Sequence, residues 1–445
     1  MTTTIINKNK KSNVPNKQEQ NQTCWDSAER EGLRPKGNVP TLRFPEFQEE
    51  WDKCELGEFA TIIGGYAFKS ETLNSIGGKY QVVKMGNLYQ NQLDLHRSPS
   101  YTDTLTRKAE NVILRKDDIA ITLTGTNNKR DFGYTYIFND VKNLLLNQRC
   151  GLIRAKGNPY FLSCLLKTHT FLNQFFESAT GGTGNQANVS TKAMEMFSVN
   201  TPSLKEQEKI GQLMALLDER IATQSKIIDK LQSLIKGLED KILDNPLWEK
   251  TYLRSFMQFF STNSLSWEQL SYEEGEIRNL HYGLIHGFQT RGINSASLPM
   301  IKNEAIPKQY TLCQVGDVAF ADASEDTGEI AKSVEFVDTI EGDTVCGLHT
   351  IHGRDVKDRT VVGFKGFAFN SRYFHNQIKR LAQGTKVFSI TANNLSSCYV
   401  YLPDLETQKA IVNLLKAYEE KLLVSKRLLE QYEKQKQYLL RQMFI

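Results

Sequence analysis

The chain has 445 residues, of which 40% are hydrophobic, 24% charged and 10% aromatic. This composition is close to the average of soluble globular proteins and excludes a disordered or collagen-like chain, and at about 150 residues per domain the length excludes a single small domain. The net charge of +4 includes seven basic and four acidic side chains within residues 1–40, so charge alone indicates no nucleic-acid partner.

The first 40 residues contain several lysines but no apolar run, so we expect a flexible tail and not a secretory signal. The longest apolar runs, such as residues 141–146, are far shorter than the roughly 20 residues that cross a bilayer. The 7 cysteines are odd in number, widely spaced and free of C-x-x-C pairs. These features predict a cytoplasmic protein without membrane contact.

A long internal repeat dominates the sequence. Three motifs recur in the same order after 197, 199 and 201 residues: W-x4-L-x2-F from Trp51 and Trp248, an aspartate followed by three apolar residues at Asp118 and Asp317, and P-x-L-x2-Q-x2-I from Pro202 and Pro403. We therefore expect a tail over 1–40, a first globular segment over 41–202, a helix over 203–245, a second globular segment over 246–403 and a second helix over 404–445. Strand-like runs and short helices, one predicted over 160–176, favour an α/β or α+β fold in each globular segment.

Two loops of the first globular segment, 124–130 and 180–186, are rich in Gly, Asn and Thr. Amide and guanidinium groups pair with the edges of DNA bases, and hydroxyl groups and lysines bind phosphates. An ordinary solvated turn is the alternative interpretation for each residue. The candidate DNA contacts here are Thr124, Thr126, Asn127, Asn128, Lys129, Arg130, Thr183, Asn185 and Gln186.

A long amphipathic helix follows Pro202, with Ser203 as the expected N-cap and Glu206 completing a capping box. Apolar residues then recur at alternating spacings of four and three from Ile210 to Ile242, interrupted by Gln224. A repeat of 3.5 residues sustained over about four heptads favours a coiled coil. A surface helix packed on its own globular segment is the alternative.

The loops of the second globular segment differ in chemistry. Residues 322–327 are acidic, and a carboxylate accepts from cytosine N4 but repels phosphates, so we expect part of this loop to face away from DNA. An irregular segment from His281 and Tyr282 onward holds further candidates. The candidate DNA contacts of this segment are His286, Gln289, Arg291, Ser324, Thr385 and Lys386.

The second long helix repeats the stripe from Ile411 to Met443, with Ser425 at the position equivalent to Gln224. Antiparallel pairing of the two helices would bring these polar residues together and set the register, as buried polar residues do in coiled coils. The expected helix-pairing residues are Ile210, Leu217, Ile221, Gln224, Ile228, Leu231, Leu422, Ser425, Leu429 and Tyr432.

No Walker A or G-x-S-x-G motif is present in the sequence. The run from Asn158 to Phe161 resembles the N-P-P-Y/F motif of amino-methyltransferases but lacks the second proline, and Asp404 with residues 419–421 has the order of a nuclease site but falls on a helix where charge is expected. A strand through Cys346, His349 and His352 would hold its end residues about 20 Å apart. We therefore expect no catalytic residue and no metal site.

Taken together, these residues resemble the specificity (S) subunit of type I restriction-modification systems. The resemblance rests on the repeated motifs, on the opening segment from Leu42 to Phe47, and above all on each P-x-L-x2-Q-x2-I element that leads into a heptad helix; it covers about residues 41–445. It implies a noncatalytic reader of double-stranded DNA. Each globular segment would be a target recognition domain for one half of a bipartite asymmetric sequence, with the helices as spacer.

The resemblance also implies two methyltransferase subunits docked on the helices and restriction subunits recruited to the assembly. S-adenosylmethionine, ATP and Mg would belong to those partners, and this chain is expected to bind no cofactor. Two other functions remain open from the residues: a coiled-coil scaffold with two protein-binding heads, and a self-contained DNA methyltransferase or nuclease.

Overall fold

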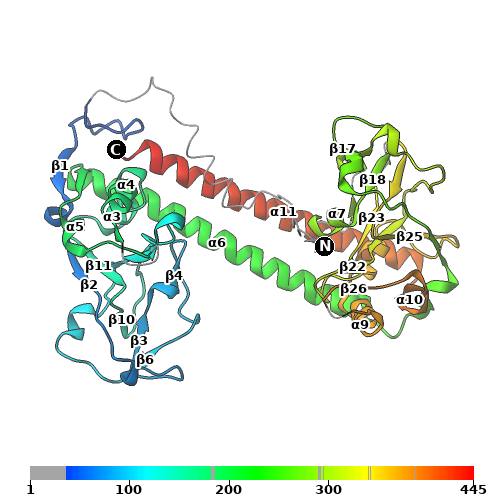
Figure 1. Cartoon of the computed structure of the whole chain (residues 1–445), viewed down its shortest axis with the longest axis horizontal. Coiled ribbons are helices and arrows are strands. Elements are labelled where there is room, and N and C mark those ends of the chain that lie inside the picture. The colour runs from blue at the N-terminus through cyan, green and yellow to red at the C-terminus, as the bar shows by residue number, and fades with distance from the viewer. Residues whose placement is uncertain are drawn as a thin grey trace, which may run out of the picture. The chain divides into compact units, whose positions relative to one another are not determined.

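The computed structural model describes residues 37–181, 186–288, 292–293, 295–338, 340, 342–384 and 386–445. They form two compact units (Figure 1). The first unit contains the chain up to Ile221 together with Gln431–Ile445, and the second unit contains Ala222–Glu430. Each long helix is therefore shared between the units, because its two ends pack with different globular parts.

The first unit is built on short sheets with helices beside them. Its main antiparallel sheet has the order β2-β11-β7-β9, and a smaller sheet has the order β10-β3-β6. The strands are β1 (Asp52–Glu55), β2 (Ala60–Gly64), β3 (Tyr80–Val83), β4 (Leu88–Tyr89), β5 (Gln92–Leu93), β6 (Tyr101–Thr102), β7 (Ile119–Thr122), β8 (Thr124–Thr126), β9 (Thr135–Ile137), β10 (Leu144–Leu146), β11 (Cys150–Ala155), β12 (Thr180–Gly181), β13 (Gln186–Asn188) and β14 (Ser198–Thr201). The short helices are α2 (Leu56–Phe59), α3 (Pro159–Leu165), α4 (His169–Glu177) and α5 (Thr191–Glu195).

The core of the first unit gathers the aromatic residues of the repeat motif and the C-terminal end of the chain. Trp51 lies edge-on to Phe161 at 5.7 Å between ring centroids, and Phe161 stacks on Phe444 at 5.2 Å. The helix expected over 160–176 is in fact two helices, α3 and α4, because Thr168 caps the second by accepting from the backbone N–H of Phe171.

The second unit repeats this arrangement of a larger and a smaller sheet with short helices, which we call the frame. Its larger sheet has the order β16-β25-β21-β23-β19 and its smaller sheet the order β17-β20-β18-β24. The strands are β15 (Glu249–Tyr252), β16 (Met257–Phe260), β17 (Leu270–Ser271), β18 (Arg278–Leu280), β19 (Gly292–Ile293), β20 (Met300–Ile301), β21 (Val318–Ala321), β22 (Ala323–Ser324), β23 (Ser333–Phe336), β24 (Thr344–Cys346), β25 (Thr350–Asp355), β26 (Phe388–Ser389) and β27 (Tyr399–Leu402). The short helices are α7 (Tyr282–Gly287), α8 (Phe364–Ala368), α9 (Arg372–Leu381) and α10 (Ala392–Ser397).

The repeated aspartate before each central strand has the same structural role in both units. Arg154 Nε donates to Asp118 Oδ1 at 2.9 Å and its Nη2 donates to a backbone carbonyl at 3.1 Å. Arg354 makes the equivalent contacts, with Nε 2.8 Å from Asp317 Oδ1. Because both carboxylates are buried, a charge-assisted pair is the arrangement that compensates their desolvation.

The repeated glutamine explains the P-x-L-x2-Q-x2-I motif. Gln207 Nε2 donates to the carbonyl of Pro202 at 2.8 Å, and its Oε1 accepts from the backbone N–H of Asn158 at 3.1 Å. Gln408 Nε2 donates to the carbonyl of Pro403 at 3.0 Å, and its Oε1 accepts from the N–H of Val361 at 3.0 Å. In each unit one buried amide thus ties the start of a long helix to the globular part.

The two long helices are α6 (Leu204–Leu243) and α11 (Leu405–Gln442). Within the first unit Lys436 pairs with Asp218, and within the second unit Gln224 Nε2 donates to the backbone carbonyl of Ser425 at 3.0 Å. Residue numbers on α11 fall as those on α6 rise, so the helices run antiparallel. At the start of α6 the Glu206 carboxylate accepts from Arg43 at 2.7 Å to each oxygen, and the expected capping box stays a prediction.

The expected helix-pairing residues are all at least partly withdrawn from solvent. The buried ones are Ile210, Leu217, Gln224, Ile228, Leu231 and Ser425, and the half-buried ones are Ile221, Leu422, Leu429 and Tyr432. Ile210 also belongs to the core of the first unit, so the start of this stripe packs against the globular part. In the described part of the chain, no helix is both long and apolar enough to cross a membrane.

Candidate nucleic-acid interface

The two candidate loops of the first unit lie side by side because both contain short strands. β8 pairs with β13 in antiparallel register, which places Thr126 opposite Gln186 and Thr124 opposite Asn188. β12 continues the same sheet. Residues separated by about 60 positions in the chain therefore meet on one small ribbon, on which Gln186 and Asn188 are exposed and Ala187 between them is buried.

The threonines of β8 have structural partners. Thr124 is 8% exposed and its hydroxyl donates to Asn188 Oδ1 at 3.0 Å. The backbone N–H of Thr126 donates to Asp131 Oδ1 at 2.6 Å. Between them, a Cβ atom on Gly125 would lie 2.7 Å from the same Asp131 oxygen and 2.8 Å from Phe132 Cβ. This glycine is therefore needed for the close approach of the ribbon to the following loop.

The basic residues of the first loop are available to a ligand. Asn128, Lys129 and Arg130 are exposed, and the Arg130 guanidinium lies 5.1 Å from the centre of the Phe176 ring. Arg130 also has a φ angle of +46°, a turn conformation that directs the chain back toward the sheet. Asn127 begins the short helix η4 (Asn127–Lys129). Thr183 and Asn185 lie outside the described residues.

The second unit places its candidates at the equivalent ribbon, where β22 pairs with β26 and Ser324 lies opposite Phe388. Ser324 is half-buried and Lys386, two residues before β26, is exposed. Its acidic loop has internal partners: Asp322 Oδ1 lies 3.0 Å from His349 Nδ1, and Asp326 Oδ1 accepts from the N–H of Gly328 at 2.7 Å. Gln289, Arg291 and Thr385 lie outside the described residues.

The histidines of the second unit are engaged with the protein. His286 on α7 has Nδ1 3.3 Å from Glu329 Oε2, and Lys332 donates to the His286 carbonyl at 3.2 Å. His281 caps α7 by accepting from the N–H of Gly283 and packs against Trp267 at 4.4 Å between ring centres. Burial, aided by the nearby His349, lowers the pKa of His281 to about 4, so this ring is neutral near pH 7.

A further basic surface in the second unit was not among the sequence predictions. A cavity of about 680 Å³ is lined by residues of α6 and α9 and of the segment between β22 and β23. Its basic side chains are Lys236, Lys332, Arg372 and Lys379, with His375 and the acidic residues Glu239, Asp240 and Glu329 beside them. The signal in the sequence was the strongly amphipathic run from Arg372 to Leu381, whose basic face is visible only once that stretch is taken as a helix.

The motifs that resembled catalytic sites are helix starts. Asn158 accepts from the N–H of Phe161 at 2.9 Å and caps α3, with Pro159 in its first turn. Asp404 accepts from the backbone N–H and the hydroxyl of Thr407, both at 2.8 Å, at the start of α11. Each residue type is explained by the N-cap role.

The expected separation of Cys346 and His352 is wrong. β24 ends at Cys346 and β25 begins at Thr350, and between them the chain turns at His349, which has a φ angle of +55°. The side chains of Cys346 and His352 therefore lie together, with Cys313 beside them, and their potential ligand atoms all lie within 4.8 Å of one another. His349 instead faces Asp322 and is about half exposed.

Comparison with known proteins now identifies the class. A family model described as the type I restriction modification DNA specificity domain matches residues 48–233 and 356–434. Because these matches cover more than half of the chain, the protein belongs to this specificity-subunit family. The sequence-based recognition of the family is confirmed.

Relatives and solved structures extend the match over most of the chain. The putative MjaX specificity subunit of Methanocaldococcus jannaschii is 22% identical over 423 residues, covering 90% of this chain and 94% of the relative. The MjaVIII specificity subunit of the same organism is 23% identical over 415 residues, covering 89% and 91%. The crystal structure of a type I restriction-modification S subunit from M. genitalium matches with a TM-score of 0.56 at 15% identity, covering 92% of this chain and 99% of that one. This structural match, the mixture of strands and helices and the two regions matched by the family model confirm the expected α+β fold with two repeated globular parts.

Proposed function

We propose that this chain is the noncatalytic specificity subunit of a type I restriction-modification complex, in which each unit reads one half of a bipartite, asymmetric target in double-stranded DNA. The observation that carries the proposal is the duplicated frame with divergent ribbons. In the first unit the β8–β13 ribbon carries Gln186 and β8 leads directly into the loop with Lys129 and Arg130, whereas in the second unit β22 lies within the acidic loop 322–327. Two units with the same arrangement of strands but different polar and charged side chains near their ribbons would read different half-sites, as an asymmetric two-part target requires.

The long helices support docking of methyltransferase subunits. On α6, Leu216, Ile227 and Leu234 are each at least 39% exposed, and α11 exposes Leu414, Val424 and Leu428 in addition to its buried stripe. Exposed apolar residues beyond the pairing seam are typical of helices that bind a further protein. We assign this surface to the methyltransferase subunits, with restriction subunits joining the assembly in the cytoplasm.

In the proposed complex, the partner subunits bind the cofactors and carry out the catalytic steps. S-adenosylmethionine would be held by the methyltransferase subunits, and ATP and Mg by the restriction subunits. The modest charge of +4 fits this division, since phosphate contacts dominate DNA affinity and a reader with few of them depends on partners for the rest. The isolated chain should therefore bind DNA weakly, and the complex tightly with a steep dependence on salt.

The decisive experiment is co-expression with methyltransferase subunits followed by genome-wide mapping of methylated sites. We expect a bipartite motif that disappears when this chain is omitted. The double variant Lys129→Ala/Arg130→Ala should relax one half of the motif, Lys386→Ala should affect the other half, and Lys69→Ala, which removes an exposed lysine that pairs with Glu71, should change neither. Equal loss of both halves in the first variant, or methylation by this chain alone, would overturn the assignment.

The spacer role of the helices has its own test. Insertion of seven residues into both α6 and α11 lengthens each by about 10.5 Å, or about three base pairs of DNA. The complex should then methylate the same two half-sites with a longer gap between them. Unchanged spacing would show that the helices do not set the distance.

A further inference from the structure

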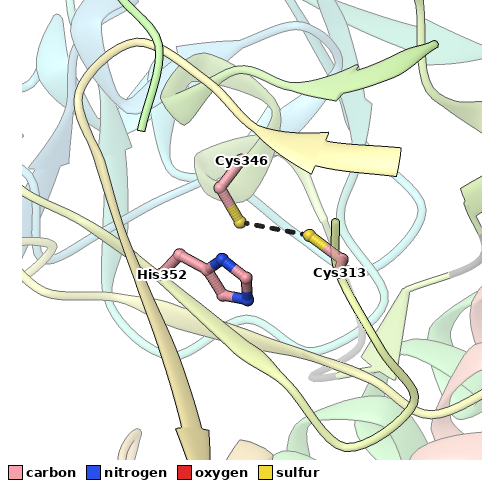
Figure 2. A group of neighbouring side chains, drawn as sticks. All are labelled: Cys313, Cys346 and His352. Carbon is pink, nitrogen blue, oxygen red and sulfur yellow. Dashed lines mark hydrogen bonds between the residues drawn. The ribbon is translucent and has the colours of Figure 1, made fainter. Parts of the chain in front are cut away.

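Two cysteines and a histidine from three different segments meet inside the second unit (Figure 2). Cys346 ends β24, His352 lies on β25, and Cys313 follows Leu312, which bridges to Val345. All three side chains are buried, with exposed fractions of 7% for Cys313, 3% for Cys346 and 1% for His352. A set of this kind, two sulfurs and an imidazole, is a ligand set that zinc prefers.

The first unit shows which residues occupy the three equivalent positions where these only fill the hydrophobic core. Leu114, Leu146 and Leu152 occupy the equivalent places: Leu152 pairs with Ala120 as His352 pairs with Ala319, and Leu146 pairs with Val83 as Cys346 pairs with Leu280. The N–H of Leu114 donates to the Leu144 carbonyl as that of Cys313 donates to the Thr344 carbonyl.

All three leucines are buried in one apolar cluster. In the second unit these three positions carry Cys, Cys and His together, while the Arg–Asp pair beside them is kept. In the first unit three leucines fill these positions. Core packing therefore does not explain why each of the three positions in the second unit carries a potential metal ligand.

The spacing of the ligand atoms suits a tetrahedral ion. The Sγ atoms of Cys313 and Cys346 lie 3.6 Å apart. Zinc–sulfur bonds of about 2.3 Å at tetrahedral angles would place two sulfurs about 3.8 Å apart. The site therefore needs only a shift of a few tenths of an ångström to hold zinc between its sulfurs.

The histidine is already oriented as a ligand. Its Nε2 lies 2.7 Å from Asp317 Oδ2, and the same carboxylate is held by Arg354. The opposite ring nitrogen, Nδ1, faces the sulfurs in Figure 2. A carboxylate that accepts from one imidazole nitrogen fixes the tautomer in which the other nitrogen is the metal ligand, the arrangement usual around zinc-bound histidines.

A polar cavity supplies the fourth position. It has a volume of about 260 Å³ and is bordered by Cys346 and His352 together with Thr262, Asn263 and Tyr310. Its hydroxyl and amide lining can hold water, and a water molecule there can reach an ion bound by three protein ligands.

We propose that the second unit binds one Zn²⁺ ion through Cys313 Sγ, Cys346 Sγ and His352 Nδ1, with water from the adjoining cavity as fourth ligand. The two thiols lose their protons to solvent as the two zinc–sulfur bonds form, and no electron is transferred. The ion would cross-link the segment before β21 to β24 and β25 and so stabilise the frame that carries the β22–β26 ribbon.

The experiment compares the full chain with a variant that carries the core of the first unit. Cys313→Leu/Cys346→Leu/His352→Leu restores the three leucines that pack in the same frame and is expected to fold without metal. Cys398→Ala, at a buried cysteine of the same unit outside the set, is the matched control.

Metal content is measured by inductively coupled plasma mass spectrometry after purification under reducing conditions. Wild type and Cys398→Ala should contain one zinc per chain and the leucine variant none. Replacement by Co²⁺ should give thiolate-to-cobalt charge-transfer absorption in the first two proteins only, and a chelator should lower their melting temperature without affecting that of the leucine variant.

The proposal is overturned if wild type is metal-free and added Zn²⁺ or Co²⁺ gives neither a rise in melting temperature nor charge-transfer absorption. It is equally overturned if the two sulfurs are found as a disulfide in protein kept under reducing conditions, or if the leucine variant retains the metal. A leucine variant that fails to fold is replaced by His352→Leu alone, which must then lose the zinc.

Discussion

Replacement of Gln224 by leucine tests whether the polar interruption of the heptad stripe sets helix register at a cost in stability. The side chain is 8% exposed and its amide donates to the carbonyl of Ser425. That carbonyl lies inside α11, where it also accepts the helical N–H of Leu429. The substitution therefore removes one hydrogen bond without leaving a buried acceptor unsatisfied.

The magnitude follows from two opposing contributions. A buried leucine contributes about 1.5–3 kcal/mol, and the lost hydrogen bond costs about 0.5–1.5 kcal/mol. The net stabilisation of about 1 kcal/mol corresponds to a rise in melting temperature of about 2–4 °C for a unit of roughly 200 residues. Gln212→Leu, at an exposed position of α6, should leave the melting temperature nearly unchanged.

The assay combines calorimetry with a distance measurement. Spin labels at the exposed positions Lys226 and Arg427, in a background without Cys24 and without the half-buried Cys54, should give one sharp distance in the parent and a broader distribution in Gln224→Leu, because an all-apolar stripe permits more than one register. A fall of several degrees in melting temperature, or an equally sharp distance distribution, would refute the reasoning.

Three further outcomes follow from the described contacts. Because the pKa of His281 is lowered in the folded state, the unfolded chain takes up a proton at a higher pH than the folded chain does. The stability of the second unit is therefore complete above about pH 6.5 and decreases as the pH falls toward 4. His281→Asn, which keeps a capping oxygen, should flatten this part of the plot of melting temperature against pH. Gln408→Ala should cost about 1–3 kcal/mol in chemical denaturation, because it leaves the partly buried N–H of Val361 without its acceptor; stability within about 0.5 kcal/mol of wild type would contradict this role. Gly125→Ala should relax one half of the methylated motif through the clash with Asp131 and Phe132, which the methylation map would report.

The sequence by itself determined the duplication, the long antiparallel helices and the family. These features are recorded in local patterns: a stripe of 3.5-residue period with polar residues at Gln224 and Ser425, and motifs that recur after about 200 residues. The helical period depends only on neighbours within a few turns, and that is why it can be read without the fold.

Only the tertiary structure decided which loop residues meet and which cysteines lie together. Thr126 and Gln186 come together through strand pairing across about 60 residues, and Cys313 reaches Cys346 through the isolated bridge between Leu312 and Val345, which are 33 residues apart. The turn at His349, which brings Cys346 to His352, requires a positive φ at a residue other than glycine and has no clear sequence signal. Register between distant strands is set by packing of the whole core, and so the candidate metal site was invisible until the fold was known.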